Sequence, residues 1–487
     1  MKKLLSLSLV LAMLLSMLTL VACGDPETTD KKDDTTPPVV QDAFVLADGE
    51  TYDGSAVEIE FSHTMGQNLR NVLDAYIEEF NKIYPNITID WTQVGNYDDV
   101  RDQISKELTA GNQPNMAYCY PDHVAVYNIA GAVQTLDSLI GSTIEVTRAD
   151  NTTEPLGLTE QQIADFIPGY YNEGKAFGDD KMYTLPFSKS TEVLYYDKTY
   201  FEANQISVPT TWDELEAVCA KLKELDPKCI PLGYDSESNW FINMCEQYGS
   251  PYTSSTGNHF LFDNETNWNF VAKFREWYQK GYVTTQEILG SYTSSLFTEQ
   301  TAETRSYMSI GSSAGATKQC PAPNDKGEYP FVVGIASIPQ VNPEKPKVIS
   351  QGPSICIFKK DNPQEVIASW LFAKYLTTSI EFQSDFSIAS GYVPVLQTVI
   401  NDPYYKKFLN SANGTTFIAA LSAKTCMDQV DAYYVSPAFK GSSAARDEVG
   451  ALMQKCFIDQ PTLTGTDAMN LIKKAFKDAV EECEYKA

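Results

Sequence analysis

The sequence has little of what metal centres and redox sites require. Its 487 residues include only three histidines, and these do not cluster. None of its ten cysteines has C-x-x-C spacing, which disfavours a zinc site or a thiol redox motif. No H-E-x-x-H motif is present, and residues 311–315 lack the Lys-Ser/Thr ending of a phosphate-binding loop. We therefore expect no cofactor and no metal.

Positive charge is also scarce. The chain has 37 Lys and Arg against 64 Asp and Glu, which gives a net charge of −27. Such a balance argues against nucleic acid and against electrostatic docking to anionic lipid. It is compatible with a neutral ligand, whereas an anionic ligand would need a local basic pocket. We expect a monomer whose partners include a small molecule but no nucleic acid.

The bulk composition is that of a large folded protein. Hydrophobic residues make up 43% and aromatic residues 12% of the chain, which is enough for a packed core. The length exceeds that of one typical core, so two lobes are expected. Apart from Cys23 there are nine cysteines, an odd number, and we expect most of them to be small buried hydrophobic residues.

The N-terminus has the features of an export signal. Lys2 and Lys3 precede an uncharged run over residues 4–22, which ends in Leu20-Val-Ala-Cys23. These last residues resemble the lipobox of bacterial lipoproteins, a family in which this cysteine is acylated and becomes the new N-terminus. Residues 1–22 are thus predicted to be a signal peptide. An uncleaved membrane helix is the alternative.

The segment after this cysteine is typical of a tether. Residues 23–50 are rich in Asp, Thr, Lys and Pro and offer little to bury, so we expect them to be disordered. Together with the lipobox, this segment predicts an extracytoplasmic protein that is lipid-anchored to the bacterial cell membrane.

Beyond the tether, strand and helix patterns alternate. Strand-like stretches at residues 57–61, 87–91 and 116–120 are separated by helical apolar stripes at 69–80 and 100–108. This order predicts an α/β layer with parallel pairing. Further along, Thr211-Trp-Asp-Glu214 is a capping box that opens a helix. More strands are expected at 192–196, 331–338 and 355–358, a helix at 365–376, and a largely helical C-terminus.

Four motifs carry a family resemblance. They are Val193-Leu-Tyr-Tyr-Asp-Lys198, Pro209-Thr-Thr-Trp-Asp-Glu-Leu215, Gln351-Gly-Pro-Ser-Ile-Cys-Ile-Phe358 and Gly391-Tyr-Val-Pro-Val395. In this order they resemble the extracellular solute-binding proteins of family 1, the substrate receptors of ABC importers. The resemblance implies an α/β, two-lobed, periplasmic-binding-protein-like fold of type II with the ligand cleft between the lobes. The implied N-terminal lobe is 51–188 plus 340–385, and the C-terminal lobe is 189–339 plus 386–487.

Within the family, the likeness is greatest to receptors for glycerol 3-phosphate and carbohydrates. It implies that ligand is bound by Tyr97, Asp122, Ser190, Trp240, Ser312, Ser313, Gly352 and Tyr392. Two positions depart from the pattern. Pro121 stands where the relatives have a carboxylate, with Asp122 one residue further on. Lys440-Gly-Ser-Ser443 lacks the arginine that serves the phosphate, and Arg446 lies three residues later, which favours a neutral ligand.

These residue types suit sugar recognition, because aromatic rings cover the flat faces of a sugar while polar groups bond its rim. Trp240 comes directly after Ser-Glu-Ser-Asn, so we expect it in a polar loop. Each residue also has a structural alternative. The aromatic residues could belong to the core, Asp122 could cap a helix, Ser312 and Ser313 could form a turn, and Ser190 could be a hinge residue without ligand contact.

The sequence therefore predicts a non-enzymatic substrate-binding lipoprotein of an ABC importer. It would capture a sugar or oligosaccharide by hinge closure and deliver it to a membrane permease. One alternative is a receptor of the same family for glycerol 3-phosphate or a glycerophosphodiester. Another is an exported glycosidase, which needs two opposed carboxylates and is not excluded by 64 acidic residues. A third is a receptor that signals to a membrane sensor without transport.

Overall fold

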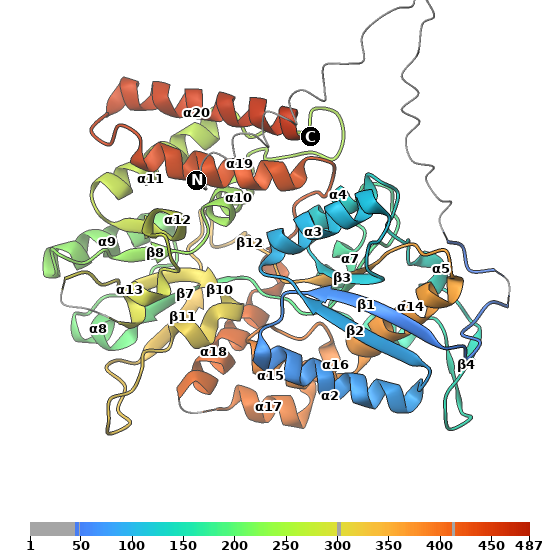
Figure 1. Ribbon diagram of the computed structural model, residues 1–487. Coiled ribbons are helices and arrows are strands. Elements are labelled where there is room, and N and C mark those ends of the chain that lie inside the picture. The colour runs from blue at the N-terminus through green and yellow to red at the C-terminus, as the bar shows by residue number, and fades with distance from the viewer. Residues whose placement is uncertain (1–43, 48, 300–302, 412–413) are drawn as a thin grey trace, which may run out of the picture. The chain divides into compact units, whose positions relative to one another are not determined.

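The computed structural model describes residues 44–47, 49–299, 303–411 and 414–487 (Figure 1). The expected signal peptide, Cys23 and most of the expected tether lie outside these residues. Among the helices that the structure describes, none has both the length and the apolar character needed to cross a membrane.

The first five-stranded sheet has the order β2-β1-β3-β13-β6. Strands β1 (Val57–His63), β2 (Ile87–Gln93) and β3 (Met116–Cys119) run parallel, which confirms the pairing expected from the sequence. Strand β13 (Ser354–Ile357) is antiparallel to β3 and to β6 (Leu185–Pro186). Helices α2 (Gln67–Ile83), α3 (Tyr97–Ala110) and α14 (Pro363–Thr378) belong to this part of the molecule.

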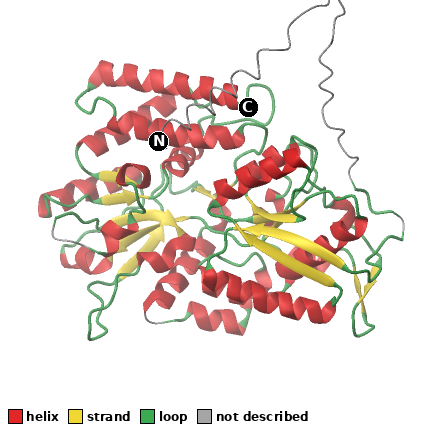
Figure 2. Ribbon diagram, in the orientation of Figure 1, coloured by secondary structure: helices red, strands yellow, loops and turns green. Residues whose placement is uncertain are grey.

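The second sheet has the order β11-β7-β10-β8-β9. Strands β8 (Leu232–Tyr234), β9 (Val283–Thr285) and β10 (Met308–Ser312) are parallel, whereas β7 (Glu192–Asp197) is antiparallel to β10 and β11 (Val333–Ser337). Helix α9 (Trp212–Leu225) begins with the predicted capping box at Thr211. The same part of the molecule contains the helices α10 (Glu237–Tyr248), α11 (Glu265–Gln279), α19 (Ser442–Ile458) and α20 (Gly465–Lys486). Figure 2 shows the strands of both sheets among helices.

The remaining elements are short connections and C-terminal helices. They are α4 (Pro121–Asn128), α5 (Asp137–Ile140), β4 (Glu145–Thr147), β5 (Thr153–Pro155), α6 (Glu160–Asp165), α7 (Pro168–Glu173), α8 (Lys198–Ala203), α12 (Gln286–Leu289), α13 (Ser294–Thr298), η1 (Ser313–Gln319), β12 (Val348–Ile349), α15 (Ile380–Ser390), α16 (Gln397–Asn401), α17 (Pro403–Leu409), α18 (Gly414–Asp428), η2 (Val430–Ala432) and β14 (Tyr433–Tyr434).

Three chain segments lie side by side where the chain passes between the two sheets. Ser190 pairs with Gln351, and Lys189 pairs with Val393, both in antiparallel bridges. Gly352 has a φ of +92°, and a Cβ there would lie 2.5 Å from the Ser188 carbonyl oxygen. A residue without a side chain is therefore required at this crossing.

The lobe limits that the resemblance implies, at residues 339–340 and 385–386, remain a proposal. Val348 and Ile349 of β12 pair with β14 and belong to the hydrophobic core of the second sheet. The expected change of lobe between residues 385 and 386 falls inside α15, which packs against α2.

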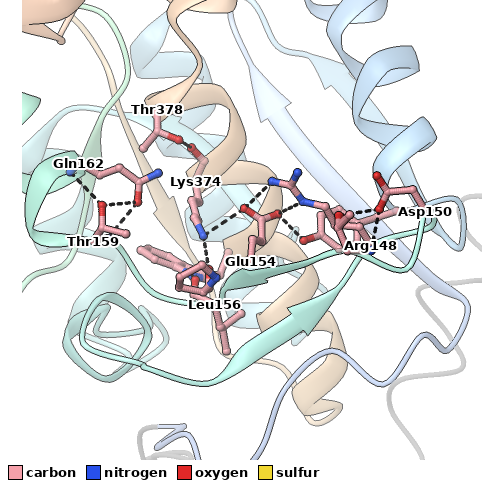
Figure 3. Close-up of polar contacts among 12 residues, drawn as sticks. Arg148, Asp150, Glu154, Leu156, Thr159, Gln162, Lys374 and Thr378 are labelled. Carbon is pink, nitrogen blue, oxygen red and sulfur yellow. Dashed lines mark hydrogen bonds and ion pairs between the residues drawn. The ribbon is translucent and has the colours of Figure 1, made fainter.

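A polar network fastens the β4–β5 hairpin to the first sheet's helices (Figure 3). Arg148 donates from Nε to Glu154 Oε1 at 3.1 Å, and its Nη2 lies 3.0 Å from Oε2. The Tyr84 hydroxyl donates to Oε1 at 2.6 Å. The Lys374 ammonium of α14 lies 3.5 Å from Oε2. Burial disfavours the charged carboxylate, but these partners outweigh it and lower the pKa of Glu154.

The cysteines pack as expected. All nine in the described residues are free; eight are buried, and Cys320 is half-buried. Burial raises the pKa of most of these thiols, for example that of Cys426 to about 11, so they remain protonated at neutral pH. Among the described residues, no group of three or more His, Cys, Asp or Glu side chains is arranged to hold a metal ion.

Candidate ligand-binding site

A cavity of about 560 Å³ lies where the carboxyl ends of parallel strands from both sheets meet. On the first sheet's side it is lined by the starts of α3 and α4, which follow β2 and β3. On the other side it is lined by residues 235–238 and 286–287, which follow β8 and β9, and by α19. This edge is where α/β sheets bind ligands, and the volume suits a small molecule.

Tyrosines form one wall of the site. Asn96 caps α3 with a capping box and thereby places Tyr97 at the first helical position. The Tyr97 ring lies 4.4 Å from that of Tyr120 and 5.8 Å from that of Tyr118, and its hydroxyl is 3.2 Å from the Tyr392 hydroxyl. Burial raises the pKa of Tyr97 and Tyr392, so both hydroxyls stay neutral and can donate or accept hydrogen bonds.

Opposite charges face the same space. Pro121 begins α4, which places Asp122 in the first turn, and Arg446 projects from α19 on the other side. Among the described residues that line the cavity, Arg446 is the only Lys or Arg. His123 also lines it, but burial lowers the pKa of this imidazole and keeps it neutral at pH 7. Arg446 thus supplies the positive charge among the described side chains that line the site.

Arg446 is held in position through Asn239 by the buried carboxylate of Glu192. The guanidinium donates to the Asn239 side chain, and the Asn239 amide donates to Glu192 at 3.1 Å. Tyr234 and Asn243 donate to the other Glu192 oxygen at 2.6 and 2.7 Å. Burial raises the pKa of Glu192 to about 7 despite these bonds. Asn239 therefore bridges Glu192 and Arg446.

Most carboxylates around the cavity already have partners. Asp98 and Asp447 lie 3.2 and 3.5 Å from the Arg101 guanidinium, and Asp235 accepts two bonds of 2.7 Å from Thr293. Asp122 differs, because no described residue forms a hydrogen bond or ion pair with it by the usual distance criteria. The exposed Glu287 carboxylate also lines the cavity and has no such partner among the described residues, so Asp122 and Glu287 are the lining carboxylates that remain available to a ligand.

Of the eight predicted site residues, the structure places only Tyr97 and Asp122 in the cavity lining. Tyr392 lies behind this lining, with its hydroxyl against that of Tyr97. Ser190 and Gly352 lie at the chain crossing, where Ser190 is buried. The Ser312 hydroxyl accepts from the Ala314 N–H at 3.2 Å and caps η1. These positions match the structural alternatives of a hinge and a turn.

Ser313 is the serine of a G-x-S-x-G pattern, Gly311–Gly315, which spans the end of strand β10 and the start of η1. Its side chain is fully buried, and its hydroxyl accepts from the Thr191 N–H at 3.2 Å. No histidine among the described residues hydrogen-bonds to it. It lacks the base that a nucleophilic serine requires.

The expectation that Trp240 sits in a polar loop is wrong. Ser236 caps α10, so the polar residues before Trp240 form the first turn of a helix. The Trp240 side chain has no exposed surface and stacks on Tyr234 at 4.7 Å and 8°. Phe274 lies 4.2 Å away on the core side. A ring enclosed by other rings fills the core of the second sheet rather than the cavity.

Most lining residues were not among the eight predicted site residues, and Tyr120 and Arg446 are two of them. Tyr120 lies directly before Pro121, so the helix start at Pro121 is the signal that could have indicated it. The sequence indicated Arg446 only as a displaced arginine. Helix α19 begins at Ser442, so its second turn carries Arg446 to the cavity.

Solved structures share this fold. An ABC substrate-binding protein from Listeria monocytogenes, in complex with cycloalternan, aligns with a TM-score of 0.67 at 16% identity over 88% of this chain and 99% of that one. UgpB from Mycobacterium tuberculosis, in complex with glycerophosphocholine, aligns with a TM-score of 0.65 at 16% identity over 87% and 98%. The predicted α/β fold of the type II periplasmic binding proteins is confirmed.

Sequence relatives point the same way. The chain is 28% identical to the sn-glycerol-3-phosphate-binding periplasmic protein UgpB of Yersinia pestis over 206 residues, 41% of this chain and 43% of that protein. For UgpB of Escherichia coli the identity is 28% over 226 residues, 45% and 48%. The matched part thus spans about half the length of these relatives. The family model described as bacterial extracellular solute-binding protein matches residues 75–410. The chain belongs to the bacterial extracellular solute-binding protein family.

Proposed function

We propose that this protein is the substrate-binding lipoprotein of an ABC importer and that it captures a neutral carbohydrate for a membrane permease. The observation that carries the proposal is the cavity of about 560 Å³ in which Tyr97 and Tyr120 stand beside Asp122 and Arg446. Rings that cover apolar sugar faces, with a few polar groups to bond hydroxyls, are what a carbohydrate site requires. Family membership supports the receptor role.

The charges around the cavity favour a neutral ligand over an anion. Arg446 is the only Lys or Arg among the described lining residues and already donates to Asn239. Asp122 has no such partner and would repel a phosphate. Lys189, the cation next to Ser190 at the chain crossing, is buried with Glu173 2.5 Å away and cannot turn to a ligand. A bound phosphate usually needs several charge-assisted hydrogen bonds, for which Arg446 is the available donor here.

Calorimetry with a ligand panel tests this assignment. We expect glucose, maltose or maltotriose to bind with an affinity that moderate salt leaves unchanged, because a neutral ligand has no charge pair to screen. Arg446→Ala should weaken that sugar about tenfold, as expected for one charge-assisted hydrogen bond. Micromolar binding of glycerol 3-phosphate alone, weakened by salt and abolished in Arg446→Ala, would contradict the preference.

The second candidate is a receptor for glycerol 3-phosphate or a glycerophosphodiester. It is supported by Arg446, which lines the cavity although it comes later in the sequence than the arginine that serves the phosphate in the relatives. The named ligands of the relatives also support it. Glycerophosphocholine in the same panel separates the two phosphate ligands, because only the diester carries a cation that Asp122 and the tyrosines could bind.

We also propose that Cys23 carries the lipid anchor. The support is Leu20-Val-Ala-Cys23, with a polar segment suited to a tether after it. Cys23→Ala should release the protein from the membrane fraction or leave the precursor uncut, because the acylated thiol is gone. The measurement is fractionation of cells with immunoblotting, and Cys320→Ala is the matched control. Normal cleavage with unchanged attachment would argue against the anchor.

A further inference from the structure

A second, smaller cavity of about 70 Å³ adjoins the main one. Tyr120, Asp122 and Arg446 line both cavities, so they form a shared boundary. The small cavity, here called the polar chamber after its polar groups, is further lined by Tyr252, Thr253 and Gln351, and its remaining lining includes the apolar side chains Ile242, Ile349 and Val435. Tyr252 and Thr253 come after α10, whereas Gln351 lies at the chain crossing. The polar chamber thus joins the ligand site to the segments about which the molecule would close.

Three buried oxygens on these residues have no hydrogen-bond partner among the described residues. They are the Tyr252 hydroxyl, the Thr253 hydroxyl and the Gln351 amide oxygen. Buried polar groups in folded proteins are almost always bonded, and leaving one unbonded is unfavourable. These three atoms belong to residues that line one small cavity, and each needs a hydrogen-bond partner that no described residue provides.

The chemistry of the polar chamber selects for hydroxyl groups. The Asp122 carboxylate and the Gln351 amide oxygen are acceptors, so they need a donor. An ionised phosphate oxygen donates nothing, whereas a hydroxyl both donates and accepts, and it also suits the Tyr252 and Thr253 hydroxyls. A water needs about 10–15 Å³ of such space, so the chamber has room for about five to seven water-sized groups and not for a whole hexose with its hydroxyls.

We propose that the polar chamber receives one hydroxyl-bearing end of the ligand, such as the hydroxymethyl group of a sugar, and that Tyr252, Thr253 and Gln351 determine specificity there. This inference rests on the proposed function, and it adds the residues that read the end of the ligand. The preference for a hydroxyl over a phosphate rests on the Asp122 and Gln351 acceptors, because Arg446 also lines the chamber and would attract an anion.

The test is Tyr252→Phe, which removes only the hydroxyl. We expect the melting temperature of the protein without ligand to stay the same or rise, because an unbonded buried oxygen is lost. The affinity for the panel sugar that binds wild type, among glucose, maltose and maltotriose, should fall about tenfold, the loss of one hydrogen bond. The two opposite changes in one variant distinguish a ligand contact from a structural role.

Tyr405→Phe is the matched control. The Tyr405 hydroxyl is also buried without a partner, but the residue lies in α17 and lines neither cavity. This variant should change the melting temperature as Tyr252→Phe does and leave sugar affinity within twofold. Thr253→Val is a second test and should weaken the same sugar by a similar factor.

A deoxy analogue of the bound sugar that lacks its hydroxymethyl oxygen completes a cycle. Wild type should bind this analogue at least about tenfold more weakly than the sugar, and the difference should be smaller in Tyr252→Phe, because the bond to Tyr252 can be lost only once. If Tyr252→Phe and Thr253→Val bind the sugar as wild type does, the chamber holds only water and the inference is overturned, while the proposed function stands. If wild type binds none of the three sugars, the proposed function fails and the inference with it.

Discussion

Replacing Trp240 by alanine should lower the free energy of unfolding by about 3–5 kcal/mol, the usual cost of emptying a large aromatic site in a core. The Trp240 ring is completely buried, stacked on Tyr234 and packed against Phe274. Trp212 lies 6.2 Å away in the same cluster. These neighbours cannot all move in to fill the space, because each is held by its own helix or strand. Urea unfolding followed by circular dichroism measures the change.

Trp268→Ala is the control for the loss of a tryptophan. Trp268 lies on α11 and is only half-buried, with its indole donating to Asp263 at 2.7 Å. Its removal should cost clearly less than that of Trp240, since less apolar surface returns to water. Sugar affinity measured on folded Trp240→Ala protein should remain near that of wild type. An unchanged unfolding free energy together with lost affinity would restore Trp240 as a ligand platform.

Lys189→Met should cost a similar amount, about 3–5 kcal/mol, because it leaves Glu173 as an unpaired buried charge. The Lys189 ammonium lies 2.5 Å from Glu173 and also donates to the Gly352 carbonyl at 3.1 Å and to Ser354 at 3.0 Å. Both charged side chains are almost completely buried. The pair thus ties the crossing segments together where the chain passes between the sheets.

The pH dependence of this variant has its origin in the same pair. Burial already raises the pKa of Glu173, and Lys189 opposes that rise. Without Lys189 the pKa of Glu173 in the folded state rises further above its value in the unfolded chain. Stability is then greatest below the unfolded pKa and is lost as the pH increases through the folded pKa. The loss of unfolding free energy that Lys189→Met causes relative to wild type should therefore be smaller at pH 5 than at pH 8, as measured by urea unfolding.

Two further variants check the cause. Lys189→Met combined with Glu173→Gln should recover part of the loss, because no buried charge remains. Lys198→Met removes an exposed pair in which Lys198 lies 3.7 Å from Glu202, and it should change stability by less than about 1 kcal/mol. Equal costs for Lys189→Met and Lys198→Met would show that the buried pair contributes no more than a surface pair.

Local patterns anticipated the secondary structure well. The capping box at Thr211 begins α9, and the apolar alternation of residues 57–61 and 87–91 appears as the parallel strands β1 and β2. Such patterns are readable because capping bonds and strand periodicity involve residues that are near in sequence. The same local reading failed at Trp240, because polar residues in a first helical turn resemble a polar loop.

The sequence by itself determined the alternation of strands and helices, the acidic balance and the motifs of the family. Through the family resemblance it also indicated Tyr97 and Asp122, and the structure places both at helix starts that come after parallel strands. Only the tertiary structure decided which residues share a cavity. Asp122 and Arg446 are separated by more than 300 residues and meet because α4 and α19 pack together. Burial decides the role of each aromatic residue in the same way, since whether a ring faces solvent or other rings depends on elements remote in the chain.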